Sequence, residues 1–231
     1  MSASASLVAI AAIEKSPGYW SGVLSRLRRD PVAMVALAVV LALILMAIFA
    51  PWVAPNDPYR SSMIRRLRPI GTPGFPLGTD ELGRDMLSRL IYGARLSLLM
   101  GVMPVIIAFF VGSAIGITAG FVGGRVNTVL MRTIDVFFAF PSVLLAIALS
   151  GALGAGIFNG LLSLTVVFIP PIARIAESVT TGVRKIEYVE AARASGASGF
   201  TIVRVHVLGN VIGPIFVYAT GLISVSLLSL I

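Results

Sequence analysis

Residues 96–124 read LSLLMGVMPVIIAFFVGSAIGITAGFVGG and contain no charged side chain. A helix needs about 20 apolar residues to cross the hydrocarbon core of a bilayer. Only helices and closed barrels satisfy their backbone polar groups in lipid, and barrel strands show short segments of alternating polarity. This run is continuous and longer than a barrel strand. It therefore predicts a membrane-spanning helix and sets the fold class as all-α.

The composition of the whole chain agrees with a membrane protein. Of the 231 residues, 57% are hydrophobic and 12% are charged, whereas soluble domains carry about 25% charged residues. There is no cysteine, which excludes disulfides and thiolate metal sites. The net charge of +8 comes from basic residues beside apolar runs, so it indicates lipid headgroups and topology rather than nucleic acid.

The apolar runs predict a polytopic transmembrane bundle with five spans. Residues 31–56 and 96–124 each supply one uncharged span. The uncharged stretch inside 135–174 is too long for one span, and the glycine-rich segment 151–156 divides it into two. Residues 207–231 supply the fifth.

Basic residues predict the orientation of the spans. An N-terminal arm, 1–30, precedes the transmembrane domain, 31–231. More Lys and Arg lie in the arm, the 125–132 loop and the 174–206 loop than in the 57–95 loop. Because basic loops stay in the cytoplasm, we expect a cytoplasmic N-terminus in a multi-pass protein of the cell membrane and an outer loop at 57–95.

The outer loop contains a polar motif before span two. Thr79 or Asp80 is expected to cap an interfacial helix that starts near Glu81. This segment is either a topological linker or a gate or docking surface at the outer mouth. The residues singled out are Gly78, Thr79, Asp80, Gly83, Arg84 and Asp85.

Two patterns lie within or next to the spans. Arg132 and Asp135 are three residues apart, so they are expected to pair on one helix face. Such a pair is either a functional site or a snorkelling pair at a span end. Gly112, Gly116 and Gly120 recur every four residues in span two and predict a face for close helix packing.

The cytoplasmic loop at 175–210 is different in kind because it is rich in small residues. Ile186 and Val189 form a small apolar patch, and Glu190-Ala191-Ala192 follows it. A helix of small residues can approach another backbone closely, and Gly196 permits a sharp turn after it. On the pattern alone, this segment is either a docking element or an ordinary amphipathic loop. No GxxxxGK[ST] phosphate-binding loop is present, so the chain does not bind ATP by that route.

Four segments together resemble one subfamily of membrane transporters. The strings are EYVEAARASGAS at 187–198 with HVL at 206–208, PLGTDELGRDMLSRLIYGARLSL at 76–98, and MRTIDVFFAFPSVLLAIAL at 131–149. They resemble the C-type permease subunit of dipeptide and oligopeptide ABC importers, which depend on a binding protein. The chain differs from that pattern at Gly209, where the family has proline. It also ends at Ile231, so we expect the family's sixth span to be missing.

The resemblance implies a type I importer permease fold and a transport function without enzymatic activity in this chain. It implies a second permease subunit in a heterodimer, one or two ATPase subunits that bind ATP–Mg, and an extracytoplasmic peptide-binding protein. This chain would carry no cofactor. The segment that docks on the ATPase would be the EAA helix, made of Ile186, Val189, Glu190, Ala191, Ala192 and Gly196. Di- and oligopeptides are the implied cargo. The alternatives are another small solute, such as a nickel chelate or glutathione, and a channel or scaffold that does not use ATP.

Overall fold

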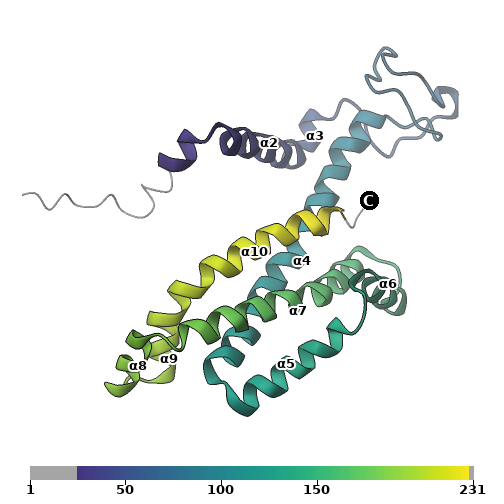
Figure 1. Ribbon diagram of the computed structural model, residues 1–231. Helices are drawn as coiled ribbons and strands as arrows, with labels where there is room; N and C mark the ends of the chain where they lie inside the picture. Colours follow the sequence, from purple (N-terminus) through teal and green to yellow (C-terminus); the bar gives the residue numbers. More distant parts are fainter. Residues whose placement is uncertain (1–24, 229–231) are drawn as a thin grey trace, which may run out of the picture.

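The computed structural model describes residues 25–228, and every regular element in this part of the chain is a helix (Figure 1). The elements are α2 (Pro31–Ile48), α3 (Ala50–Val53), η2 (Met63–Arg65), α4 (Met86–Val122), α5 (Gly124–Phe138), α6 (Ser142–Leu153), α7 (Ile157–Val183), α8 (Glu187–Ala194), α9 (Gly199–Ile202), η3 (Val203–Val207) and α10 (Leu208–Leu228). The predicted arm lies outside the described residues except for 25–30, and so does the end of span five at 229–231.

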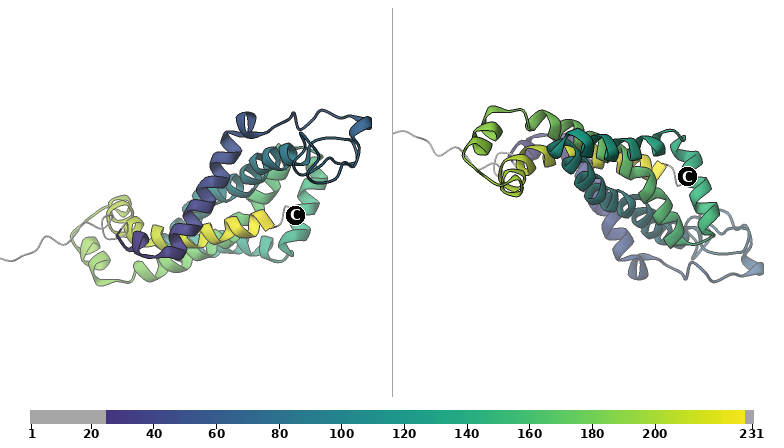
Figure 2. Two further views of the ribbon diagram at one scale, coloured as in Figure 1. Left: turned by 90° about the horizontal axis from the view of Figure 1, so that it is seen from above. Right: turned by 90° about the horizontal axis from the view of Figure 1, so that it is seen from below.

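Helix α2 begins where its sequence provides a cap. The carboxylate of Asp30 accepts hydrogen bonds from the N–H groups of Val32 and Ala33 at 3.0 and 3.1 Å. Pro31 follows at the first helical position, where no N–H is needed. α2 packs against α3 and α4 (Figures 1 and 2).

Helix α4 is the longest element, with 37 residues. At 1.5 Å per residue it measures about 55 Å, compared with a hydrocarbon core of about 30 Å. Part of α4 therefore extends beyond the hydrocarbon core, and its N-terminal end follows directly on the outer loop. The sequence predicted an interfacial helix followed by a span, and the structure joins the two in one continuous helix.

The third span is broken. Residues 125–132, predicted as a loop, lie in α5 instead, because Gly123 and Gly124, with φ of 72° and 51°, make the turn before them. α5 and α6 meet at an angle of 86°. Pro141 stands immediately before α6, and a residue that precedes proline is disfavoured in a helix. The predicted glycine-rich divide is confirmed, since Gly154 and Gly156 with positive φ separate α6 from α7.

The predicted glycine face of α4 is confirmed as its contact with α7. An added Cβ at Gly112 would lie 2.9 Å from the carbonyl oxygen of Ile169, and one at Gly120 would lie 2.7 Å from that of Glu177. Gly116, between them, meets the backbone of Ala173 in the same way. Only glycine allows two helices to pack this closely. We call this contact the glycine seam.

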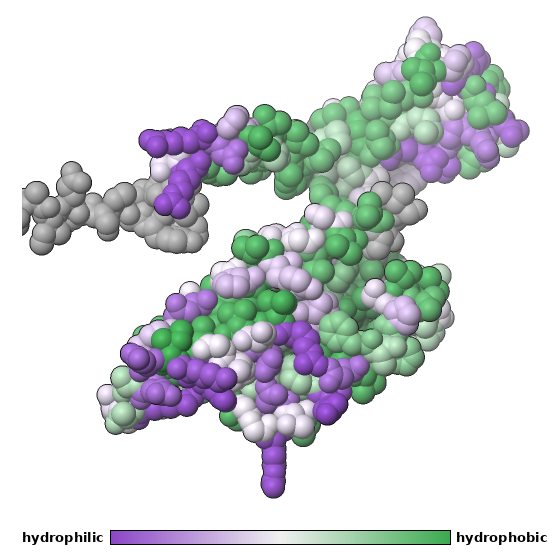
Figure 3. Space-filling view, in the orientation of Figure 1, coloured by the Kyte–Doolittle hydropathy of each residue, from purple (hydrophilic) through white to green (hydrophobic). Residues whose placement is uncertain are grey.

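The chain returns through α9, η3 and α10, and α10 packs against both α4 and α7. Within residues 25–228, four helices are long and apolar enough to cross a membrane, and the bent α5–α6 pair makes a fifth if it counts as one span. The five predicted spans therefore correspond to four continuous helices and one broken one. The surface fits this assignment, because apolar residues cover α2 and the adjoining part of α4, while hydrophilic residues gather on the outer loop (Figure 3).

Candidate functional site

Helix α8 carries the Glu190-Ala191-Ala192 segment at the end of the bundle opposite the outer loop (Figure 1). Val189 is completely buried and belongs to the main hydrophobic core, and Ala192 packs against that core. The guanidinium of Arg193 lies over the ring of Phe121, 5.3 Å from its centroid. These contacts fix α8 to the C-terminal end of α4.

The chain leaves α8 through a Schellman turn. The N–H of Ala197 donates to the carbonyl of Ala192 at 3.1 Å, and the N–H of Gly196 donates to that of Arg193 at 3.0 Å. Gly196 has φ of 78°, in the left-handed region that favours glycine. The sharp turn predicted at Gly196 is therefore present. An added Cβ there would meet nothing within 4 Å. Glycine is therefore favoured at this position by the left-handed backbone conformation and not by a lack of space for a side chain.

The opposite face of α8 is open to a partner. Glu190 and Ala191 are exposed, and Ile186 is 43% exposed at the helix start. Within residues 25–228, the Glu190 carboxylate has no hydrogen bond or ion pair. The face thus combines an unpaired acid, a small residue and an apolar side chain. This composition suits a helix that lies in a groove of another protein.

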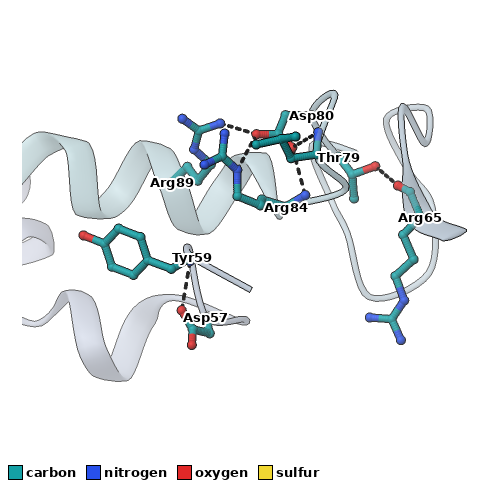
Figure 4. Close-up of polar contacts among 8 residues, drawn as sticks. Asp57, Tyr59, Arg65, Thr79, Asp80, Arg84 and Arg89 are labelled. Atoms are coloured by element: carbon teal, nitrogen blue, oxygen red, sulfur yellow. Dashed lines mark hydrogen bonds and ion pairs between the residues drawn. The ribbon is translucent and has the colours of Figure 1, made fainter. Parts of the chain in front are cut away.

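The outer loop is folded by its own polar groups (Figure 4). The carboxylate of Asp80 accepts from the N–H groups of Leu82 and Arg84, both at 2.9 Å, and from Nε of Arg84 at 2.8 Å. It also forms an ion pair with Arg89. The prediction that a helix starts near Glu81 is wrong, because Asp80 uses its side chain to close a tight turn and α4 begins only at Met86.

Burial of the Asp80 carboxylate raises its pKa, but the hydrogen bonds from Arg84 and Leu82 and the charge of Arg84 lower it by more. The net result is a pKa lowered from 3.8 to about 2. The folded loop therefore favours the ionised acid.

The remaining motif residues of the outer loop hold its two ends together. The Thr79 hydroxyl accepts from the N–H of Arg68 at 2.9 Å and donates to the carbonyl of Arg65. Asp85 caps α4 by accepting from the N–H and hydroxyl of Ser88 at 3.1 and 2.5 Å.

Two glycines of this loop stand where the backbone leaves no room for a side chain. Gly78 and Gly83 have φ of 74° and 71°, and a Cβ at either would strike a neighbouring carbonyl. The structure therefore places Gly78, Thr79, Asp80, Gly83, Arg84 and Asp85 together in one compact turn.

The ion pair predicted between Arg132 and Asp135 is replaced by another one. Asp135 pairs with Arg174, which comes from α7. Spacing along one helix suggested Arg132, but α7 packs beside α5 and brings a second guanidinium to the same carboxylate. The bond therefore joins two helices instead of two turns of one.

Comparisons with known proteins match these elements. The sequence model of the family described as the binding-protein-dependent transport system inner membrane component matches residues 112–231. The chain belongs to this family. A second family, described as the N-terminal TM domain of oligopeptide transport permease C, matches residues 18–69. The match at 112–231 includes α8 and runs from the last part of α4 through α10.

Three similar proteins are permease subunits of peptide or glutathione transport systems. This permease chain is 37% identical over 194 residues to the probable D,D-dipeptide transport system permease protein DdpC of Escherichia coli (strain K12), covering 84% of this chain and 65% of the relative. It is 40% identical over 193 residues to the di/tripeptide transport system permease protein DppC of Pseudomonas aeruginosa (strain UCBPP-PA14), covering 81% and 64%. It is 34% identical over 210 residues to the glutathione transport system permease protein GsiD of Pectobacterium atrosepticum, covering 91% and 70%. The chain thus spans about two thirds of the length of these relatives, and it is a multi-pass membrane protein of the permease type.

Sequence reasoning missed the polar contacts that join α5 and α4 to α7 in this permease chain. The side-chain amide of Asn127 donates to Glu177 at 2.6 Å and to the carbonyl of Ala119 at 3.2 Å. Arg184 donates to the carbonyl of Phe121 at 3.2 Å. The spacing of Arg174 and Glu177, one turn apart on α7, was the signal available in the sequence. In the described part of the chain, no group of three or more His, Cys, Asp or Glu could hold a metal ion.

Proposed function

We propose that this chain is a permease subunit of an ATP-driven importer for di- and oligopeptides and that α8 couples it to a cytoplasmic ATPase. Membership of the inner membrane component family supports the importer class. The relatives named as dipeptide and di/tripeptide permeases support the cargo. The observation that carries the coupling role is the geometry of α8, which is anchored on one face by Val189 and presents Glu190 and Ala191 on the other.

In this proposal the N-terminus and α8 lie in the cytoplasm. A second, different permease subunit completes the path across the bilayer. One or two ATPase subunits bind ATP–Mg, and this chain itself binds no cofactor. An extracytoplasmic peptide-binding protein delivers the cargo to the side of the outer loop.

The coupling is mechanical. Arg193 holds α8 against Phe121 at the C-terminal end of α4, and Val189 holds it in the hydrophobic core. When the ATPase displaces α8, the helices in contact with α8 therefore move with it. Glu190 supplies an acceptor for N–H or Arg groups of the partner, and Ala191 allows its backbone to come close.

Uptake of a labelled dipeptide by the transporter reconstituted in proteoliposomes tests this function. We expect accumulation that requires ATP inside, the binding protein outside and all membrane subunits. Competition by unlabelled tripeptide, glutathione and a nickel chelate distinguishes the cargo classes, since the relative GsiD is named for glutathione. Dipeptide uptake that proceeds equally without ATP would refute the proposal and favour a channel.

A second experiment isolates the role of α8. Glu190→Arg reverses the unpaired charge on the exposed face, and Glu190→Gln, which keeps the size of the side chain without a reversed charge, is the matched control. We expect Glu190→Arg to reduce ATP-driven uptake about tenfold or more, because a positive charge placed against the partner's N–H or Arg groups is a like-charge contact that costs several kcal/mol. Equal uptake by both variants and the unmodified chain would count against docking through Glu190.

A further inference from the structure

The Asp135–Arg174 ion pair lies at membrane depth. Asp135 stands about 16 Å along α5 from Gly124, and Arg174 about 14 Å before the end of α7 at Val183, at 1.5 Å per residue. α7 has 27 residues and measures about 40 Å, so each end overhangs the core of about 30 Å by roughly 5 Å. With α7 centred on the core, Arg174 lies about 9 Å inside the nearer edge of the hydrocarbon zone, so it belongs to the span and not to the loop predicted at 174–206.

Both charges reach the surface of the subunit at that depth. The side chain of Asp135 is 38% exposed and that of Arg174 is 40% exposed. Charged groups at this level are costly against lipid and face protein or water instead. In Figure 3, hydrophilic residues show among apolar ones on the side of the bundle where α5 lies.

A cavity of about 300 Å³ lies between the α5–α6 break, α7 and α10, and residues one helical turn from each member of the pair line it. Phe138 lines it and lies three residues after Asp135, on the same face of α5. Pro171 lines it and lies three residues before Arg174, on the same face of α7. The rings of Phe137, Phe140 and Phe168 also line it. The result is an aromatic hollow with one acid and one base a helical turn away.

We propose that this face lines the water-filled path and forms a subsite for zwitterionic peptides. The aromatic cavity receives an apolar side chain of the peptide. The ion pair between Asp135 and Arg174 opens: Asp135 then binds the terminal ammonium, and Arg174 binds the terminal carboxylate, which its planar guanidinium can hold through two bonds. A partner subunit packed on this face would have to fill the cavity and desolvate both charges. The cargo class rests on the proposed function, whereas the exposure of the face to water does not.

The chain has no cysteine, so a single introduced cysteine is the one thiol of this chain, and modification is read on this chain. Phe138→Cys is the test position, Leu41→Cys on α2 is the apolar control, and Tyr59→Cys in the outer loop is the water-exposed control. The probe is a membrane-impermeant, charged methanethiosulfonate reagent on the transporter reconstituted in proteoliposomes. Because the thiolate is the reactive form and needs water, we expect Phe138→Cys to react about tenfold or more faster than Leu41→Cys in at least one nucleotide state. Reaction as slow as that of Leu41→Cys in every nucleotide state would overturn the proposal.

Protection by ligands then tests the roles of the two charges. Dialanine should slow modification of Phe138→Cys, while N-acetyl-dialanine and dialanine amide should each protect at concentrations roughly tenfold to a hundredfold higher, the value of one charged hydrogen bond. In the Phe138→Cys chain that also carries Asp135→Asn, dialanine and N-acetyl-dialanine should protect at the same concentration. In the Phe138→Cys chain that also carries Arg174→Gln, dialanine and dialanine amide should protect at the same concentration. A purely structural ion pair would weaken protection by all three ligands equally, which would refute the subsite.

The two proposals fail separately. ATP-driven dipeptide uptake together with an unreactive Phe138→Cys would leave the proposed function standing and remove the subsite. A reactive Phe138→Cys that dialanine protects, in a transporter whose uptake ignores ATP, would keep the subsite and remove the ATP-driven function.

Discussion

The glycine seam between α4 and α7 predicts opposite effects for the same substitution at two positions on one helix. Gly120 faces α7, whereas an added Cβ at Gly93 on the same helix would meet nothing within 4 Å. We therefore compare Gly120→Ala with Gly93→Ala. The two variants share the added methyl group, the helix and the gain in helix propensity, and they differ only in what the methyl group contacts.

The expected magnitudes follow from the contacts. At Gly120 the new Cβ would lie 2.7 Å from the carbonyl oxygen of Glu177 and 2.8 Å from Cβ of Thr180, so the helices must move apart. Such overpacking costs about 1–3 kcal/mol. Alanine is favoured over glycine in a helix by about 0.5–1 kcal/mol. We expect Gly120→Ala to lose roughly 0.5–2 kcal/mol of unfolding free energy and Gly93→Ala to gain up to about 1 kcal/mol.

Unfolding in mixed detergent micelles, with sodium dodecyl sulfate as denaturant and helicity as the readout, measures the free energy of both variants. Gly112→Ala should behave like Gly120→Ala, because its Cβ would lie 2.9 Å from the carbonyl of Ile169. If Gly120→Ala and Gly93→Ala shift the midpoint in the same direction by the same amount, close packing at the seam is not what glycine provides there.

Three further predictions concern the two polar ends of the molecule. The pKa of Asp80 is lowered from 3.8 to about 2, so the ionised carboxylate contributes fully to stability above about pH 4, and this contribution is lost as the pH falls through 2. Proteolysis of the outer loop in the unmodified chain should therefore increase as the pH falls from about 4 to about 2. In Asp80→Asn, proteolysis should be high and nearly independent of pH. Gly196→Val should impair ATP-driven uptake while Gly196→Asn retains most of it, because asparagine tolerates the left-handed conformation and a β-branched residue does not; equal uptake by the two variants would exclude a role for the turn. Arg193→Gln should loosen α8 by removing the cation–π contact with Phe121, which is worth about 0.5–1 kcal/mol at an exposed site, and hydrogen exchange of α8 should then be faster by a factor of about 2–5.

The spans and the glycine seam could be predicted because each depends on residues close together in the sequence. An uncharged run of sufficient length leaves helix as the only continuous solution, and glycine every fourth residue forms one face whatever the partner. The turn at Gly196 was predictable for the same local reason.

The misplaced elements depend on contacts across the chain or on competing local bonds. Asp135 pairs with Arg174 because α5 and α7 lie side by side, and helical spacing carries no information about α7. Asp80 could cap a helix or close a turn. The guanidinium groups of Arg84 and Arg89 favour the turn, which moves the start of α4 to Met86. Pro141 permits a bend between α5 and α6, but the sequence does not give its angle of 86°. Both helices also pack against α7, and these contacts are not visible in the local sequence.

The central claim is that α8 docks on the ATPase, and site-specific photocrosslinking tests it directly. A photoreactive amino acid replaces Ala191 on the exposed face of α8, and in a second preparation it replaces Tyr59 in the outer loop as the control. On irradiation of the assembled transporter, we predict a covalent adduct between this chain and the ATPase subunit from position 191 and none from position 59. An intact transporter that gives no ATPase adduct from position 191, or gives equal adducts from both positions, would contradict the claim.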